Sequence, residues 1–252
     1  MISSQFAIEV RLRRDEVPSF DEYPFSLPAV RSLDVLRFHP SVTFFVGENG
    51  SGKSTLLEAI AVCAGFNAEG GTRNFRFGTR PSHSPLHEYL RLAKGVRRFK
   101  DGFFLRAESF FNVATEIERL DAEGMGRRVI DSYGGRSLHE QSHGESFMTL
   151  LLERFRGEGL YLLDEPEAAL SPQRQLAALT RIHDLVQAQS QFIIATHSPI
   201  LLAYPDAQIY SFSSEGMERL DYFDTEHYRV THDFLANPKR MLDLLFQDDA
   251  GA

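Results

Sequence analysis

The chain of 252 residues contains no tryptophan and a single cysteine, Cys63. A lone cysteine cannot form a disulfide within the chain, so we expect a cytoplasmic protein that works in a reducing compartment. Long hydrophobic runs are also missing. Eighteen apolar residues never occur in a row, which argues against a membrane-spanning helix. Residues 1–17 alternate apolar with charged side chains and contain no apolar signal core.

A second group of absences excludes particular classes of protein. The sequence has no internal repeat, no sustained heptad pattern and no recognisable nuclease motif. Four histidines, His83, His87, His139 and His143, lack the spacing of metal ligands. We therefore expect neither a long coiled-coil arm nor a histidine metal centre.

Positive charge is scarce overall but locally concentrated. The formal net charge is −8, from 27 Lys and Arg against 35 Asp and Glu. An acidic chain is poorly suited to indiscriminate binding of nucleic acid, although it can carry a local basic face. Residues 73–100 are such a stretch, with eight basic residues, one acid (Glu88) and interleaved aromatics. Three interpretations stay open for this stretch: contact with nucleic-acid phosphates, contact with a protein partner, or a solvated face. The basic residues are Arg73, Arg76, Arg80, Arg91, Lys94, Arg97, Arg98 and Lys100.

The hydrophobic pattern predicts an α/β fold. Short apolar segments typical of buried strands alternate with segments of helical spacing, which favours a mainly parallel sheet flanked by helices. The alternating first strand favours a separate antiparallel edge. We expect one domain over residues 1–252, with an inserted helical lobe at about 67–150. The expected strands are 5–13, 41–46, 102–106, 160–163, 192–195 and 209–212, and the expected helices are 54–64, 110–120, 146–155, 172–189 and 232–246.

The clearest motif is a glycine loop between a strand and a helix. Residues 47–54 (GENGSGKS) match the phosphate-loop pattern G-x-x-x-x-G-K-[ST], known as Walker A. Its glycines let backbone N–H groups surround a polyphosphate, and the following helix directs its positive end at the same anion. Lys53 would bridge β- and γ-phosphate oxygens, and the Ser54 hydroxyl would bind Mg²⁺. The expected nucleotide-binding residues are Gly47, Asn49, Gly50, Ser51, Gly52, Lys53, Ser54 and Thr55.

Two carboxylates end an apolar strand later in the chain, in the segment LYLLDEP at 160–166 (Walker B). The carboxyl end of a buried parallel strand lies at the sheet edge where ligands of α/β proteins bind. Asp164 can reach the Mg²⁺ shell there, and Glu165 can polarise a water for attack on the γ-phosphate. The pair therefore predicts an ATPase that converts ATP and water to ADP and phosphate. A solvated pair of acids at a helix start is the other interpretation.

Two further segments, QSHGE at 141–145 and ATHS at 195–198, complete a resemblance to the ABC ATPase superfamily. The resemblance runs from the first strand to at least His197. It implies that Ser142 and Gly144 contact the γ-phosphate of a nucleotide bound to a second copy of the chain. It also implies that His197 is the switch histidine that orients the attacking water, and that ATP and Mg²⁺ support a homodimer. A plain helix cap at Ser142 and a core or surface role for His197 are the alternatives.

Departures from the transporter form of these motifs indicate a branch of the superfamily. QSHGE stands where transporters have LSGGQ, and EAALSP follows the carboxylates at 167–172 in place of the usual SALD. These features resemble small stand-alone bacterial ATPases of the RecF/SMC-like kind, which implies a role in DNA maintenance or defence. The alternative function is the nucleotide-binding subunit of an ABC transporter. A nucleotide-sensing regulator with little turnover is a third hypothesis.

Two placements that the resemblance suggests stay open. The family has a glutamine that contacts Mg²⁺ and the attacking water, and Glu108 follows the strand at 102–106 where that residue is expected. Glu108 either binds the metal or belongs to a helix cap with Ser109. The aromatic residue that stacks on adenine is Tyr23, Phe25 or Phe38.

Overall fold

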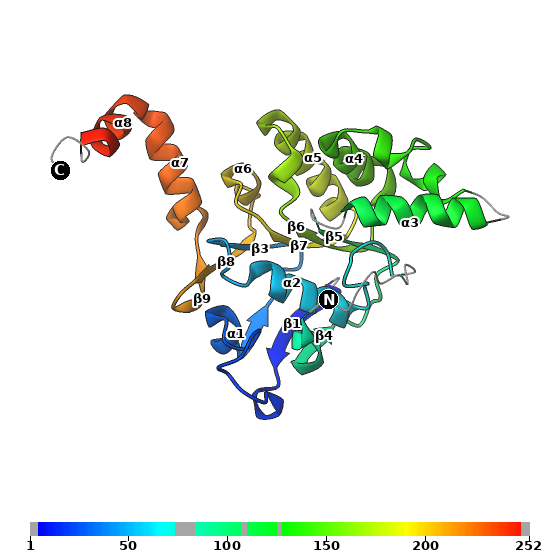
Figure 1. Cartoon of the computed structure of the whole chain (residues 1–252), viewed down its shortest axis with the longest axis horizontal. Helices are drawn as coiled ribbons and strands as arrows, with labels where there is room; N and C mark the ends of the chain where they lie inside the picture. The colour runs from blue at the N-terminus through cyan, green and yellow to red at the C-terminus, as the bar shows by residue number, and fades with distance from the viewer. Residues whose placement is uncertain (1–4, 74–83, 107–109, 125–127, 248–252) are drawn as a thin grey trace.

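The computed structural model describes residues 5–73, 84–106, 110–124 and 128–247. Its centre is a six-stranded sheet in the order β5-β6-β7-β3-β8-β9 (Figure 1). The first five strands in this order are parallel, and β9 pairs antiparallel with β8. The strands are β3 (Val42–Gly47), β5 (Asp101–Arg106), β6 (Gly159–Asp164), β7 (Gln191–Ala195), β8 (Gln208–Ser213) and β9 (Gly216–Leu220). The predicted mainly parallel sheet is confirmed.

A second sheet is antiparallel throughout and has the order β2-β1-β4. Its strands are β1 (Ala7–Leu12), β2 (Val35–Arg37) and β4 (Leu90–Lys94). The separate antiparallel element predicted around the first strand is therefore present. The expected alternation holds in the second half of β1, where Val10 and Leu12 are buried and Arg11 is exposed. It is reversed at the start, where Ala7 is buried and Ile8 is exposed, because the pairing register shifts between Ala7 and Glu9.

Helices cover both faces of the central sheet (Figure 1). On one face, side chains of α3, α4, α5 and α6 form a core with β3, β5, β6 and β7. On the other face, α1 and α2 lie between the central sheet and the antiparallel sheet and share a second core with both. The helices are α1 (Pro28–Arg31), α2 (Lys53–Ala64), α3 (Phe110–Glu123), α4 (His143–Thr149), α5 (Pro172–Gln187), α6 (Pro199–Leu202), α7 (Glu226–Ala236) and α8 (Pro238–Gln247).

Two sequence predictions need correction. The closing helix expected at 232–246 is two helices, α7 and α8, which meet at Asn237 and Pro238. Proline lacks the N–H that a continuous helix needs, so the chain turns there. The stretch 67–150, predicted as a helical lobe, contains β4 and β5, and these strands belong to the two sheets. Among its described residues, a short 3₁₀ helix at Pro85–Tyr89 comes first, and the first α-helix is α3.

The helices α7 and α8 extend away from the two sheets (Figure 1). Neither α7 nor the described part of α8 has a buried side chain, and Leu235, Leu245 and Phe246 are more than half exposed. In contrast, the first residues of α7 lie beside the carboxyl ends of the parallel strands, next to the phosphate loop.

Candidate active site

The phosphate loop joins the carboxyl end of β3 to the first turn of α2, as the motif predicts. Gly47 has a φ of +143°, and a Cβ added there would lie 2.2 Å from the carbonyl oxygen of Phe212 on β8. Only glycine fits this position, because both the backbone conformation and the close approach of β8 exclude a side chain. Gly52 adopts a left-handed conformation immediately before Lys53 and so turns the loop into the helix.

Lys53 is 4% exposed, and its ammonium group points back into the loop. Nζ donates hydrogen bonds of 2.8 Å to the carbonyl oxygens of Gly47 and Glu48. Burial lowers the pKa of Lys53, whereas the carboxylates of Glu165 and Asp164 act in the opposite direction. A desolvated ammonium group held by two carbonyl oxygens favours an incoming anion, since charged acceptors form the stronger hydrogen bonds.

The Ser54 hydroxyl donates a 2.9 Å hydrogen bond to Oδ1 of Asp164, which is 8% exposed at the end of β6. The structure thus brings together two residues that are 110 positions apart in sequence. Hydroxyl and carboxylate oxygens are ligands that Mg²⁺ prefers, together with water and substrate phosphates. Within the described residues, no cluster of three or more His, Cys, Asp or Glu forms a complete metal cage. The donor set therefore fits an ion that is held jointly with phosphate oxygens.

Glu165 and His197 come from neighbouring parallel strands, β6 and β7. Glu165 has a left-handed backbone conformation (φ +49°), and its N–H donates to the carbonyl oxygen of Ala195 at 2.9 Å. Its Oε1 lies 3.5 Å from Nε2 of His197. The backbone N–H of His197 donates to Oε1 of Glu167 at 2.5 Å. Glu167 is thus a site residue to which the sequence analysis assigned no role.

Three buried side-chain atoms in this region have no hydrogen-bond partner among the described residues: Ser51 Oγ, Glu167 Oε2 and His197 Nε2. Native proteins leave few buried polar atoms unpaired, and such atoms commonly await a ligand or water. Ser51 lies in the phosphate loop, His197 Nε2 lies 3.5 Å from Oε1 of Glu165, and the other carboxylate oxygen of Glu167 accepts from the His197 N–H. The unpaired atoms thus converge on the region where the motifs predict the γ-phosphate.

His227, the second residue of α7, belongs to the site although no sequence motif includes it. Its Nε2 lies 3.0 Å from Nδ1 of His197. His227 and Glu226 line a cavity of about 380 Å³ with loop residues 47–51, and a second of about 470 Å³ with Glu165 and His197. Nothing in the local sequence marks His227, because its place in the site depends on how α7 packs.

Ser142 and Gly144 lie at the start of α4. Ser142 is the N-cap: its hydroxyl accepts a hydrogen bond from the Glu145 N–H at 3.3 Å, and its own N–H donates to Oε2 of Glu145 at 3.0 Å. This is the capping role that the sequence left as an alternative. A Cβ on Gly144 would lie 2.4 Å from the carbonyl oxygen of Ala169, so α4 packs closely against the turn that follows Glu165.

Within one chain, Ser142 and Gly144 do not line the two cavities beside the phosphate loop. They line a different cavity, of about 470 Å³, together with Asp164 and Glu165. The structure of a single chain therefore brings them near the carboxylates and leaves them away from residues 47–51.

The other predicted site residues have mixed outcomes. Glu108 lies outside the described residues. Phe25 and Phe38 are each 4% exposed in the core between the two sheets, so they are unsuited to stacking on a base. Tyr23 is 63% exposed, and its hydroxyl lies 3.4 Å from Oγ1 of Thr55, next to the phosphate loop. Burial thus leaves Tyr23 as the remaining candidate of the three.

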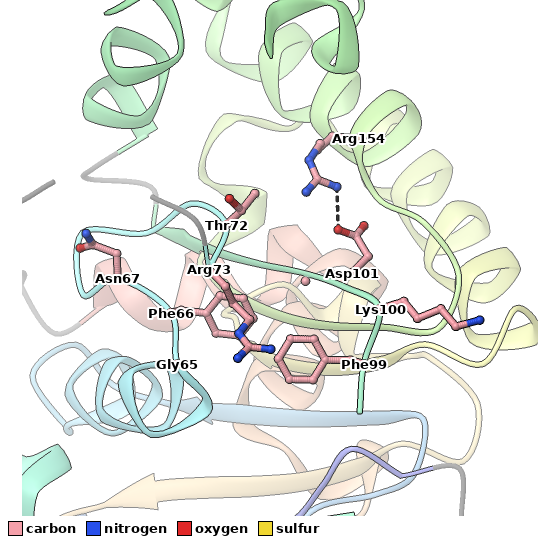
Figure 2. A pocket seen from close by; sticks show the side chains of 10 residues that line it. Gly65, Phe66, Asn67, Thr72, Arg73, Phe99, Lys100, Asp101 and Arg154 are labelled. Carbon is pink, nitrogen blue, oxygen red and sulfur yellow. Dashed lines mark hydrogen bonds and ion pairs between the residues drawn. The ribbon is translucent and has the colours of Figure 1, made fainter. Parts of the chain in front are cut away.

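The basic stretch lies partly at a polar cavity of about 660 Å³ (Figure 2). This cavity is at the start of β5 and beyond the end of α2, which is the sheet edge opposite to the phosphate loop. The Arg73 guanidinium lies over the Phe99 ring, 5.0 Å from its centroid, and Lys100 pairs with Glu158. Arg154 pairs with Asp101 at 2.7 Å (Figure 2). Some of the predicted basic residues are therefore bound within the chain.

The remaining basic residues of the stretch differ in exposure. Arg97 pairs with Glu158, whereas Arg91, Lys94 and Arg98 are exposed. Arg76 and Arg80 lie outside the described residues. Of the described residues, no helix is both long and apolar enough to span a membrane.

Comparison with known proteins supports the class of this site. A family model described as an AAA domain (AAA_23) matches residues 25–144, which include the phosphate loop and the start of α4. Comparison with curated proteins gave no match. Among solved structures, a chain described as an inward-facing metal-chelate type ABC transporter is 15% identical, with a TM-score of 0.50. The alignment covers 90% of this chain and 88% of that one.

Two other solved structures give lower scores. The SMC head domain from Thermotoga maritima is 16% identical, with 86% of this chain and 98% of that chain covered and a TM-score of 0.41. The cbiO1 protein from Clostridium perfringens, part of an ABC transporter complex, is 17% identical, with 84% and 90% covered and a TM-score of 0.45. Because these two TM-scores are below 0.5, the likeness in fold is taken only from the transporter chain with the TM-score of 0.50.

The chain is thus similar to an AAA domain over residues 25–144 and, in its fold, to a chain of an ABC transporter. The carboxyl ends of β3, β6 and β7 carry the phosphate loop, the pair Asp164 and Glu165, and His197.

Proposed function

We propose that the protein binds ATP with Mg²⁺ and hydrolyses it to ADP and phosphate. The observation that carries this proposal is the convergence of the hydrogen-bonded pair Ser54–Asp164 with buried, unpaired polar atoms of Ser51 and His197 at one sheet edge. A site with an unpaired buried donor beside a carboxylate is suited to a polyanion and a divalent cation.

Each residue has a role that follows from its position. Lys53 exchanges its carbonyl partners for β- and γ-phosphate oxygens, and the backbone N–H groups of the loop surround the phosphates. Ser54 and Asp164 would hold Mg²⁺, which would neutralise charge on the phosphates. Glu165 accepts a proton from the attacking water, and His197 donates a hydrogen bond through Nε2. Tyr23 offers an exposed ring for adenine beside Thr55.

We further propose that the hydrolytic unit is a homodimer. Ser142 and Gly144 are separated from the phosphate loop of their own chain, which is the arrangement that a contact with the partner's nucleotide requires. Two copies arranged head to tail would enclose two ATP molecules, and hydrolysis would separate them. The chain would then work as an ATP-dependent switch between open and closed states.

For the biological role we propose a RecF/SMC-like ATPase in DNA maintenance or defence. This rests on the motif resemblance and on the exposure of Arg91, Lys94 and Arg98, which can contact a phosphate backbone. Faster ATP turnover by the wild type in the presence of double-stranded DNA would support this role. Turnover that is insensitive to DNA would favour a protein partner instead.

The proposed function is tested with Glu165→Gln, a variant that should retain ATP because the amide cannot accept the water proton. We expect turnover to fall by about 10²- to 10⁴-fold, the usual contribution of a general base. We also expect the light-scattering mass to double when Mg-ATP is added. A variant that binds ATP but stays monomeric would refute the homodimer and make a different partner chain the better hypothesis.

The companion variant is Lys53→Ala, which removes the ammonium group that would bind the phosphates. Nucleotide affinity should fall roughly 10- to 100-fold, since a hydrogen bond to a charged group contributes about 1.5–3 kcal/mol. The mass should then stay monomeric with or without Mg-ATP. Wild-type affinity in this variant would disprove the phosphate-loop assignment.

A further inference from the structure

His227 contacts the ring of His197 from outside every motif of the sequence. It is held by the start of α7, where Thr225 is 1% exposed and caps the helix by accepting from the Tyr228 N–H. The Thr225 hydroxyl also donates to the carbonyl oxygen of Tyr222 at 2.7 Å. The position of His227 is therefore set by a buried cap, and its Nε2 lies 3.0 Å from Nδ1 of His197.

The opposite nitrogen of His197 faces a carboxylate. Nε2 is buried, lies 3.5 Å from Oε1 of Glu165, and has no hydrogen-bond partner among the described residues. An ionised carboxylate only accepts hydrogen bonds. A bare Nε2 lone pair at this place would therefore face the Glu165 carboxylate, which is also an acceptor. An Nε2–H would instead face an acceptor to which it can donate.

A neutral imidazole carries a hydrogen on only one of its two ring nitrogens. The contact between the two rings determines which nitrogen of His197 carries it. If His197 donated through Nδ1, its Nε2 lone pair would point at Glu165. If His227 donates through its own Nε2, then Nδ1 of His197 is the acceptor and the hydrogen of His197 is on Nε2. Of the two neutral arrangements, only the second satisfies both contacts.

We propose that His227 is a positioning residue that donates its Nε2–H to Nδ1 of His197 and thereby directs the single N–H of His197 toward Glu165. This inference rests on the proposed function for its consequence, because Glu165, toward which the N–H is directed, is the proposed acceptor of the water proton. The proton arrangement itself is a property of the folded chain with or without nucleotide.

The surroundings of His227 support a neutral donor. Burial is the largest cause that lowers the pKa of His227, and the neighbouring His197 and Lys53 lower it further, whereas Glu226 raises it. A neutral ring provides the required Nε2–H without adding a positive charge beside Lys53.

The test is nitrogen-15 NMR of the histidine side chains in the whole protein, without nucleotide, at neutral pH. We expect His197 to carry its hydrogen on Nε2, with Nδ1 unprotonated. In His227→Leu the donor is absent, so we expect Nδ1 of His197 to move toward the protonated state. In His227→Gln the amide N–H can replace the donor, and the wild-type pattern should be kept.

Kinetics supply the second readout. His227→Leu should lower kcat by about 3- to 10-fold, the worth of one neutral hydrogen bond, with KM for ATP unchanged within twofold. His227→Gln should restore most of kcat. The control is His232→Leu, an exposed histidine on the same helix that should leave both readouts unchanged.

A wild-type His197 with its hydrogen on Nδ1 would overturn the inference. So would a His227→Leu variant that matches the wild type in both its NMR pattern and kcat. The two proposals fail separately. A wild type that lacks ATP turnover but shows the expected NMR pattern refutes the proposed function and leaves the histidine pair standing.

Discussion

At the scale of single residues, His39 forms hydrogen bonds with the backbone and a side chain at the start of the strand that leads to the site. Its Nδ1 accepts hydrogen bonds from the N–H groups of Ser41 at 3.2 Å and Val42 at 3.4 Å, and its own N–H donates to Thr43 Oγ1 at 2.8 Å. These contacts start β3, the strand that ends at the phosphate loop. Nδ1 can accept only while it is unprotonated.

The first prediction at this scale concerns pH. Burial lowers the pKa of His39 below its usual value near 6.5, although Asp206 partly opposes the shift. The unfolded chain therefore binds this proton more readily than the folded protein, so the stability is present above about pH 6.5 and is lost as the pH falls toward the folded pKa. We expect the free energy of unfolding to fall less steeply between pH 7 and 5.5 in His39→Asn than in the wild type.

Urea denaturation at several pH values measures this difference. The Asn side-chain oxygen can accept from the Ser41 N–H in the same geometry, so the variant keeps the turn and removes only the titration. Identical pH slopes for the two proteins would show that His39 does not contribute.

At the scale of elements, the start of α4 is fixed by a reciprocal helix cap. Ser142 caps the helix reciprocally with Glu145, whose pKa is lowered mainly by these hydrogen bonds. Gly144 brings the same turn against Ala169, just after Asp164 and Glu165. A helix start that is fixed in this way is suited to present its first residues to a partner's phosphate.

A pair of substitutions separates the cap from the proposed contact with the partner. Ser142→Asn preserves an N-cap acceptor, whereas Ser142→Arg removes the cap and adds bulk at the proposed interface. In the Glu165→Gln background, we expect Mg-ATP to double the mass of the Asn variant and to leave the Arg variant monomeric. Both should bind nucleotide as tightly as the parent in a fluorescence titration.

Stability provides the internal check on this pair. The Arg variant should lose about 1 kcal/mol of unfolding free energy through the missing cap. A doubled mass in the Arg variant would contradict the role of Ser142 across a dimer interface, and the cap would then be its remaining function.

At the scale of the whole molecule, Gln191 connects the two sheets. It starts β7 and is 1% exposed. Its Oε1 accepts from the N–H groups of Phe6 and Ala7 at 3.0 and 2.9 Å, and its Nε2 donates to the carbonyl oxygens of Ala7 and His39 at 2.8 and 2.9 Å. One amide thus satisfies four backbone groups between the antiparallel sheet and the central sheet.

We expect Gln191→Leu to lower the unfolding free energy by about 3 kcal/mol or more. The substitution leaves buried backbone groups unpaired, at a cost of about 1–3 kcal/mol each. Gln208→Leu is the control, because Gln208 donates to the Arg37 carbonyl oxygen at an exposed position, and it should change stability by about 0.5 kcal/mol or less. Equal denaturation midpoints for the two variants would show that this connection is unimportant.

The sequence alone determined those features that depend on neighbouring residues. The glycine loop at 47–54, the apolar strand that ends in Asp164 and Glu165, and the alternation of β1 are local patterns, and the strands and helices form where these patterns predict them. The break at Pro238 is equally local and could have been predicted, since proline cannot continue the closing helix.

Only the tertiary structure decided which distant residues meet. It pairs Ser54 with Asp164, brings His227 of α7 against His197, buries Phe25 and Phe38, and pairs β4 of the predicted helical lobe with β1. Each of these depends on packing between elements far apart in the chain. A sequence pattern reports the preferences of a short segment, whereas the partner that each segment finds is set by the burial and hydrogen bonding of the whole fold.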